Sequence, residues 1–169
     1  MKVGLVGGSF NPPHQGHIHV SNIALKACKL NQIWWIPTLY NPLKDKNIYD
    51  SYENRIKKCE LITKDNYQIN VKKYQEIRTD FLIKKLSKKY NNIEFYWIMG
   101  ADNLENFHKW HNFKFLANSL NFIIVSRETF LTKAKKTKCW RFFNKKNTKL
   151  IFAKKKYISS TQIRESLKN

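Results

Sequence analysis

The chain has 169 residues, a length that predicts a single domain spanning 1–169 with a substantial core. A hydrophobic fraction of 42% and an aromatic fraction of 14% exclude an intrinsically disordered protein. The formal net charge of +20 raises nucleic acid as a partner. Only five of the 32 basic residues are arginine, however, and the lysines are spread along the whole chain. A general compositional bias toward lysine is the simpler account of this pattern, and attraction of anionic partners, which include ATP, is the alternative; nucleic acid is not the expected partner.

The N-terminal apolar run ends at Gly7 and is too short for a signal peptide, and no later run has the length of a membrane span. The three cysteines (Cys28, Cys59 and Cys139) are far apart and form no CxxC pair, which is typical of reduced thiols. We therefore expect a cytoplasmic protein without membrane attachment.

Apolar periodicity and turn residues predict strands that alternate with helices. The first half of the chain predicts a strand at Lys2–Val6, a helix from His17, a strand at Ile33–Ile36, a loop at Thr38–Tyr49 and a helix to about Ile62 with an Asp50/Glu53 capping box. A strand at Tyr67–Val71 follows, and then a helix at Phe81–Tyr90 with Phe81, Leu82 and Leu86 on one side. The rest of the chain predicts strands at Ile93–Met99, Leu120–Val125 and Leu150–Ala153 and a short helix at Thr161–Leu167. The basic stretch Lys133–Lys149 has no clear assignment. The alternation predicts an α/β fold with a mainly parallel sheet.

The segment GGSFNPPHQGH, from Gly7 to His17, follows the first strand and precedes the first helix. Paired glycines allow a ligand to approach the backbone, and a helix N-terminus attracts anions. His14 and His17 are one helical turn apart, so their imidazoles could donate to phosphate oxygens on the same side. Metal binding is the alternative for these two histidines, but no third ligand lies nearby in sequence, and we expect no protein-held metal.

The segment ISSTQIRES, from Ile158 to Ser166, places three hydroxyls before a short helix, with Arg164 three residues after Thr161. Hydroxyls, free N–H groups and a forked guanidinium suit phosphate oxygens. Taken alone, the segment is also an ordinary helix cap.

Four blocks together resemble bacterial nicotinate-mononucleotide adenylyltransferases of the HxGH nucleotidylyltransferase superfamily. The blocks occur in that family's order and span nearly the whole chain: GGSFNPPHQGH, GADNLENFHKW (Gly100–Trp110), NFIIVSRE (Asn121–Glu128) and ISSTQIR. The resemblance implies a Rossmann-like three-layer nucleotidylyltransferase fold. It also implies transfer of the adenylyl group of ATP to nicotinate mononucleotide, without a covalent intermediate, as a step of NAD biosynthesis.

The resemblance implies roles for particular residues in three groups. Catalytic roles fall to His14, His17, Lys44 and Arg164; ATP binding falls to Gly8, Ser9, Phe10, Gly100, Asp102, Ser160 and Thr161; binding of the pyridine nucleotide falls to Thr79 and Trp110. Mg²⁺ is expected to arrive with ATP. Because the attacking group is already a phosphate, no general base is needed, and the reaction requires alignment and compensation of charge on phosphate oxygens.

The sequence departs from the family at Leu43, where a histidine usually precedes the lysine, and at Arg78–Leu82, where a YTxDT-like segment is usual. The second departure leaves the choice between nicotinate and nicotinamide open, and the oligomeric state is equally open.

Two other functions compete with this interpretation. A phosphopantetheine adenylyltransferase would carry TxGH and lack the GADN block, and a basic nucleic-acid-binding protein would leave both end motifs unexplained.

Overall fold

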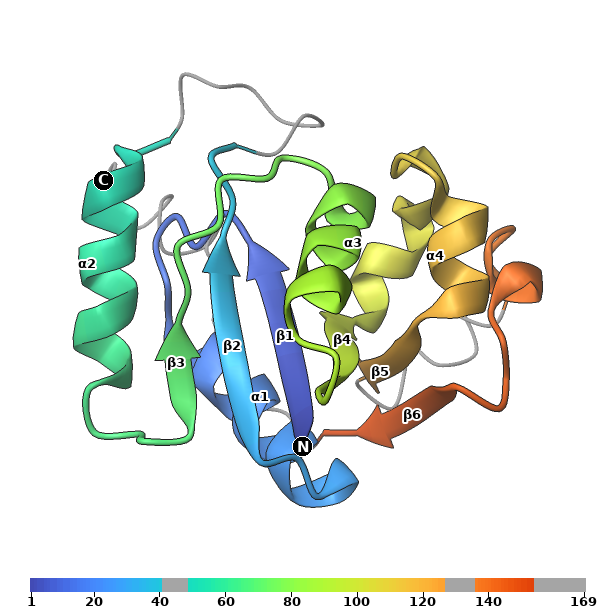
Figure 1. Ribbon diagram of the computed structural model, residues 1–169, viewed down its shortest axis with the longest axis horizontal. Helices are drawn as coiled ribbons and strands as arrows, with labels where there is room; N and C mark the ends of the chain where they lie inside the picture. Colours follow the sequence, from blue (N-terminus) through green and yellow to red (C-terminus); the bar gives the residue numbers. More distant parts are fainter. Residues whose placement is uncertain (41–48, 127–135, 154–169) are drawn as a thin grey trace.

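The computed structural model describes residues 1–40, 49–126 and 136–153, and the fold is drawn in Figure 1. These residues form a six-stranded sheet in the order β3-β2-β1-β4-β5-β6, and every pairing is parallel. The strands are β1 (Lys2–Gly8), β2 (Gln32–Pro37), β3 (Ile69–Val71), β4 (Glu94–Gly100), β5 (Asn121–Ser126) and β6 (Thr148–Phe152). The prediction of a Rossmann-like α/β fold is confirmed. The strand order reverses between β1 and β4, the place where open parallel sheets bind ligands.

Helices cover both faces of the sheet and give three layers (Figure 1). One face packs against α1 (Gln15–Cys28) and α2 (Tyr52–Thr63) through a core that includes Ala24, Cys59 and Trp35. The other face packs against α3 (Thr79–Lys89) and α4 (Phe113–Ser119). Short 3-10 helices lie at Ala101–Glu105, Phe107–Lys109 and Trp140–Phe142.

Alternation along the central strands supplies both cores. In β2, Trp34 and Ile36 belong to the α3/α4 core, while Ile33 and Trp35 belong to the α1/α2 core. Successive strand residues point to opposite faces, so a strand that is covered on both sides is apolar throughout. This is why β2 reads QIWWIP rather than as an alternating pattern.

Three local predictions are corrected by the structure. Ser51, not Asp50, caps α2, and its Oγ accepts a hydrogen bond from the Asn54 N–H at 3.2 Å. The third strand begins at Ile69 rather than Tyr67, because the chain turns at residues 67–68 and the Ile69 N–H donates to the Asn66 carbonyl at 2.9 Å. Phe81 does not share the buried side of α3 with Leu82 and Leu86; the side chain is 49% exposed and lies near the His111 ring.

The three cysteines are free and buried, as expected for reduced thiols. Within the described ranges, no helix combines the length and apolar character that crossing a bilayer requires. The predicted helix at Thr161–Leu167 lies outside the described residues.

Candidate active site

A cavity of about 690 Å³ lies at the carboxyl ends of the central strands. One wall is formed by the end of β1 and the loop that follows β2, through Gly8, Ser9, Thr38 and Tyr40. The opposite wall comes from the start of α3 and the segment after β4, and its members include Arg78, Thr79, Asp102, Lys109, Trp110 and His111. The cavity therefore sits where the strand order reverses, as the fold predicts.

Gly7 and Trp97 also line this cavity. A Cβ at residue 7 would lie 2.4 Å from Cη2 of the Trp97 indole, a distance that no side chain tolerates. The first glycine of the GG pair is therefore required by the buried indole on β4. At Gly8 the nearest atom to an added Cβ is a Phe10 carbon at 3.8 Å, so this position has room.

His14 and His17 cap the N-terminus of α1 reciprocally. Nδ1 of His14 accepts a hydrogen bond from the Gly16 N–H at 3.1 Å, and Nδ1 of His17 accepts one from the His14 N–H at 3.2 Å. The arrangement is a capping box in which imidazoles replace the usual hydroxyl and carboxamide. Because Nδ1 of each ring is an acceptor, the proton of each neutral ring lies on Nε2. The cap thus leaves each histidine with one N–H donor at Nε2.

Both rings favour the neutral state. Burial lowers the pKa of His14. Burial, together with repulsion from His14, lowers the pKa of His17 to about 3. The ring centroids are 3.9 Å apart, so a charge on one ring opposes a charge on the other. A neutral imidazole can still donate from Nε2, and a bound polyanion would favour the protonated form.

Phe10 packs between the buried Trp35 ring and the histidine turn. Its ring stacks on Trp35, with centroids 4.8 Å apart, and contacts the His17 ring at 4.7 Å. Phe10 has a φ of 46°, in the left-handed region that costs a residue with a Cβ about 1 kcal/mol or more. The side chain is 1% exposed, and this burial offsets the backbone strain.

Trp110 lines the opposite wall and is held by other aromatic rings. Its indole packs edge-on against Trp97 with centroids 6.0 Å apart, and it contacts Phe107 at 5.1 Å. Thr79, the first residue of α3, lies in the same wall beside Arg78. The wall thus joins an aromatic face to cationic groups, a combination suited to a flat ring that carries negative charge.

Asp80 and His111 form a link behind this wall that the sequence analysis missed. Oδ2 of the fully buried Asp80 lies 3.0 Å from His111 Nδ1 and accepts a hydrogen bond from Asn112 Nδ2 at 2.8 Å. These two partners lower the pKa of Asp80 although burial opposes the shift. No sequence signal pairs residues that are 31 positions apart in this way. The link ties the start of α3 to the chain just after Trp110.

The structure brings together most of the described residues that the sequence singles out. The cavity is lined by Gly8, Ser9, Thr79, Asp102 and Trp110. Phe10, His14 and His17 do not line it; they form the adjoining turn that continues from Ser9. Gly100 ends β4 next to the Asp102 segment. The remaining predicted residues, Lys44, Ser160, Thr161 and Arg164, lie outside the described residues, so the expected convergence of Arg164 with the histidines stays a prediction.

Comparisons with known proteins agree with this geometry. Residues 5–166 match the cytidylyltransferase-like family model. A protein of Pelagibacter ubique described as a probable nicotinate-nucleotide adenylyltransferase is 39% identical over 97% of this chain and 92% of its own length. A protein of Agrobacterium fabrum with the same description is 40% identical over 75% of this chain and 70% of its own length.

Among solved structures, the Plasmodium falciparum nicotinic acid mononucleotide adenylyltransferase complexed with NaAD superposes with a TM-score of 0.81. It is 21% identical, and the match covers 97% of this chain and 82% of that one, which supports the fold. The family of this chain is assigned from the family model and the sequence relatives. The chain belongs to the cytidylyltransferase-like family and, within it, to the nicotinate-nucleotide adenylyltransferases.

Proposed function

We propose that this protein transfers the adenylyl group of ATP to nicotinate mononucleotide in NAD biosynthesis. The observation that carries the proposal is the two-sided cavity at the switch point of the sheet. The loops after β1 and β2 supply part of its lining beside the histidine turn, and Trp110, with the start of α3, supplies another part. Relatives that are 39% and 40% identical carry the same activity in their descriptions.

In the proposed reaction, a phosphate oxygen of nicotinate mononucleotide attacks the α-phosphorus of ATP. The new P–O bond forms as the bond from the α-phosphorus to the bridging oxygen breaks, and pyrophosphate leaves with the electron pair. Since the nucleophile is already anionic, the protein has to align the two phosphates and stabilise the charge that develops on oxygen. Donors from His14 and His17 supply that stabilisation in this proposal, with a Nε2–H on each ring.

In this proposal ATP contacts Gly8 and Ser9 in the first wall, Phe10 in the adjoining turn, and Gly100 and Asp102 at the end of β4. Lys44, Ser160, Thr161 and Arg164 add phosphate contacts by the family resemblance. Thr79 and Trp110 hold the pyridine nucleotide at the opposite wall. We call the wall of Gly8, Ser9, Thr38 and Tyr40 the ATP wall, and that of Thr79, Trp110 and His111 the pyridine wall.

In this proposal Mg²⁺ binds together with ATP, coordinated mainly by the triphosphate. Among the described residues that line the cavity, Asp102 supplies the one carboxylate, and the described parts of the chain hold no group of three or more potential metal ligands. That donor set suits a cation coordinated mainly by phosphate oxygens and water. When bound, Mg²⁺ would offset negative charge on those oxygens.

The cavity favours the acid over the amide form of the mononucleotide. Arg78 and Lys109 line the pyridine end, and Asp80 engages Nδ1 of His111. A carboxylate accepts stronger hydrogen bonds than a carboxamide, and backbone N–H donors are available whichever side chains occupy Arg78–Leu82. We therefore assign nicotinate mononucleotide as the preferred substrate. A reaction between such small, water-soluble nucleotides fits a cytoplasmic enzyme.

Pyrophosphate release tests the proposal directly. The purified protein is incubated with ATP and Mg²⁺ and, in separate reactions, nicotinate mononucleotide, nicotinamide mononucleotide or phosphopantetheine. Release with nicotinate mononucleotide supports the proposal. If pyrophosphate is released with phosphopantetheine and with neither mononucleotide, the substrate is reassigned. Salt-dependent nucleic-acid binding without pyrophosphate release from any substrate would remove the enzyme assignment.

A further inference from the structure

We propose that Arg55 is a positioning residue for ATP binding, which holds the loops after β1 and β2 in the conformation that forms the ATP wall. The inference rests on the proposed function for the identity of the ligand. Arg55 lies on α2 and is 1% exposed, away from the cavity lining. It therefore acts through the loops that it binds rather than by touching the nucleotide.

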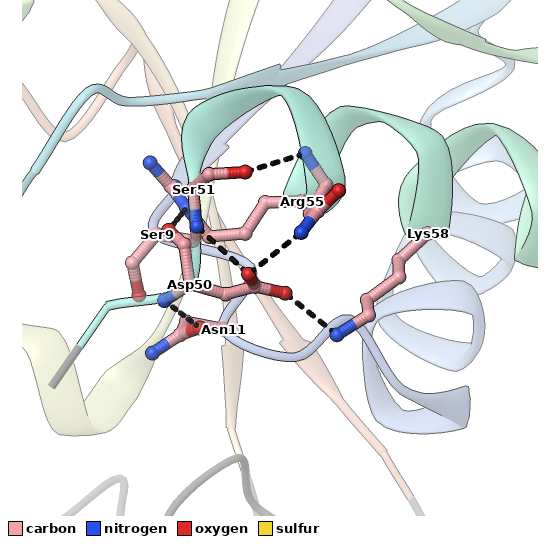
Figure 2. Close-up of polar contacts among 7 residues, drawn as sticks. Ser9, Asn11, Asp50, Ser51, Arg55 and Lys58 are labelled. Carbon is pink, nitrogen blue, oxygen red and sulfur yellow. Dashed lines mark hydrogen bonds and ion pairs between the residues drawn. The ribbon is translucent and has the colours of Figure 1, made fainter.

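The guanidinium binds four backbone carbonyls from three separate stretches of chain. Nη1 donates to the Ser9 oxygen at 2.5 Å and to the Thr38 oxygen at 2.8 Å. Nη2 donates to the Leu39 oxygen at 2.6 Å, and Nε donates to the Asp50 oxygen at 3.1 Å. Figure 2 shows the side chain reaching from its helix to Ser9 and Asp50. One side chain thus joins the end of β1, the exit from β2 and the entry to α2.

Stability alone does not explain a buried cation at this position. No carboxylate lies within ion-pair distance of Arg55 in the described ranges, and burial lowers the pKa of its guanidinium. Burying a charge costs desolvation free energy, and an apolar side chain of similar volume often gives the fold equal or greater stability. The rings of Tyr49 and Tyr52, 5.5 and 5.6 Å away, add weak cation–π attraction. What arginine offers here is a planar fork of donors that fixes several acceptors at once.

Two of the four acceptors belong to the ATP wall itself. Ser9 and Thr38 line the cavity, and their carbonyl oxygens are committed to the buried guanidinium. Carbonyl oxygens that faced a triphosphate would repel it. By engaging these oxygens, Arg55 keeps the negative ends of two peptide dipoles directed to itself and away from an anionic ligand.

The other two acceptors flank the segment 41–48, which contains Lys44. Leu39 precedes this segment and Asp50 follows it, so Arg55 fixes the chain on both sides of the predicted phosphate-binding lysine. A second route joins the same parts: the Asp50 N–H donates to Asn11 Oδ1 at 3.1 Å (Figure 2). The turn after β1 and the start of α2 are therefore tied together twice.

The test compares nucleotide affinities in Arg55→Lys. Lysine keeps the positive charge but concentrates its donors on one nitrogen, so it cannot span the four carbonyls. We expect the Kd for ATP, measured by calorimetry without the second substrate, to rise about fivefold or more, the equivalent of one lost hydrogen bond. The KM for ATP should rise by a similar factor, while the KM for nicotinate mononucleotide stays within about twofold because the pyridine wall lies on other elements.

Lys58→Met is the matched control on the same helix. It removes the 2.7 Å ion pair between Lys58 and the Asp50 carboxylate but leaves every Arg55 contact intact, so ATP affinity should not change. If Arg55→Lys does not fold, Asn11→Ala replaces it, since that change cuts the second route while leaving the guanidinium in place; the Kd for ATP should then rise about twofold or more.

The outcomes separate the two proposals. A purely structural role would reduce the active fraction, and hence apparent kcat, without changing the Kd for ATP; that result would overturn the assignment of Arg55. Equal weakening for both substrates would overturn it as well. If wild-type protein releases no pyrophosphate with any substrate, the proposed function fails, while the ATP calorimetry still decides the role of Arg55.

Discussion

His17 offers a sharp test of the proposed chemistry, because the structure separates its two roles. Nδ1 accepts the His14 N–H and stabilises the start of α1, which leaves Nε2–H as the one donor available to a phosphate. We expect His17→Ala to lower kcat by about 10²- to 10³-fold, the cost of removing one preorganised donor to a developing oxyanion. The KM for ATP should change less than about threefold, because this donor acts mainly in the transition state.

Loss of the cap does not account for such a decrease. Removing a capping acceptor costs about 1 kcal/mol, which is small beside the roughly 5–15 kcal/mol that stabilises a typical domain. His17→Ala should therefore remain folded by circular dichroism at 25 °C, with a moderately lower Tm. Steady-state pyrophosphate release at saturating mononucleotide gives kcat and the KM for ATP separately.

His19→Ala is the control, since His19 belongs to the same helix but not to the reciprocal cap. It should leave kcat within about twofold of wild type if the effect is specific to the signature histidines. An increase in the KM for ATP at unchanged kcat in His17→Ala would show that His17 binds ATP in the ground state and does not stabilise charge in the transition state.

Four further predictions concern selectivity, packing, the buried link and pH. At moderate salt, which screens the +20 surface, kcat/KM for nicotinate mononucleotide should exceed that for nicotinamide mononucleotide by at least about tenfold; equal values would remove the acid assignment. Chemical denaturation of Gly7→Ala should show a loss of about 1–3 kcal/mol from the clash with Trp97, whereas Gly8→Ala should cost less than half as much; equal losses would contradict the packing. Asp80→Asn should destabilise the fold by about 1–3 kcal/mol and raise the KM for nicotinate mononucleotide but not for ATP; an effect on ATP alone would contradict the placement of this link. Because the folded-state pKa of His17 lies near 3, below the unfolded value of about 6.5, its contribution to unfolding free energy is complete above pH 6.5 and decreases as the pH falls toward 3. The decrease in Tm between pH 6.5 and pH 5 should therefore be smaller in His17→Ala; an unchanged pH dependence would contradict the lowered pKa.

The sequence by itself determined the fold class and most of the elements. Apolar runs such as Ile33–Ile36 and Phe95–Met99, the latter within the predicted strand Ile93–Met99, are long enough for strands buried on both faces, and the helices between them carry a 3.6-residue period. The spacing of His14 and His17 also sufficed to place both rings on one side of a helix start, because one turn separates them. These features are local, so the order of residues along the chain encodes them directly.

The ends of helices and strands were harder to predict from the sequence, because neighbouring residues can each act as the cap or the first residue of an element. Asp50 and Ser51 are both good capping residues, and the choice of Ser51 depends on where the chain returns to the sheet. Phe81 follows the apolar pattern of α3 but lies beside Arg78 and His111, because the chain after Trp110 passes close to it.

Only the tertiary structure decided the contacts between distant segments. Gly7 is required by Trp97, which is 90 positions away, and Asp80 engages His111 across 31 positions. Arg55 has no recognisable signature, because its partners are backbone carbonyls, which every residue possesses. A sequence pattern records which side chains are present, whereas these contacts depend on which loops the sheet brings together. That is why the signature histidines could be found from the sequence, and the arginine behind their loop could not.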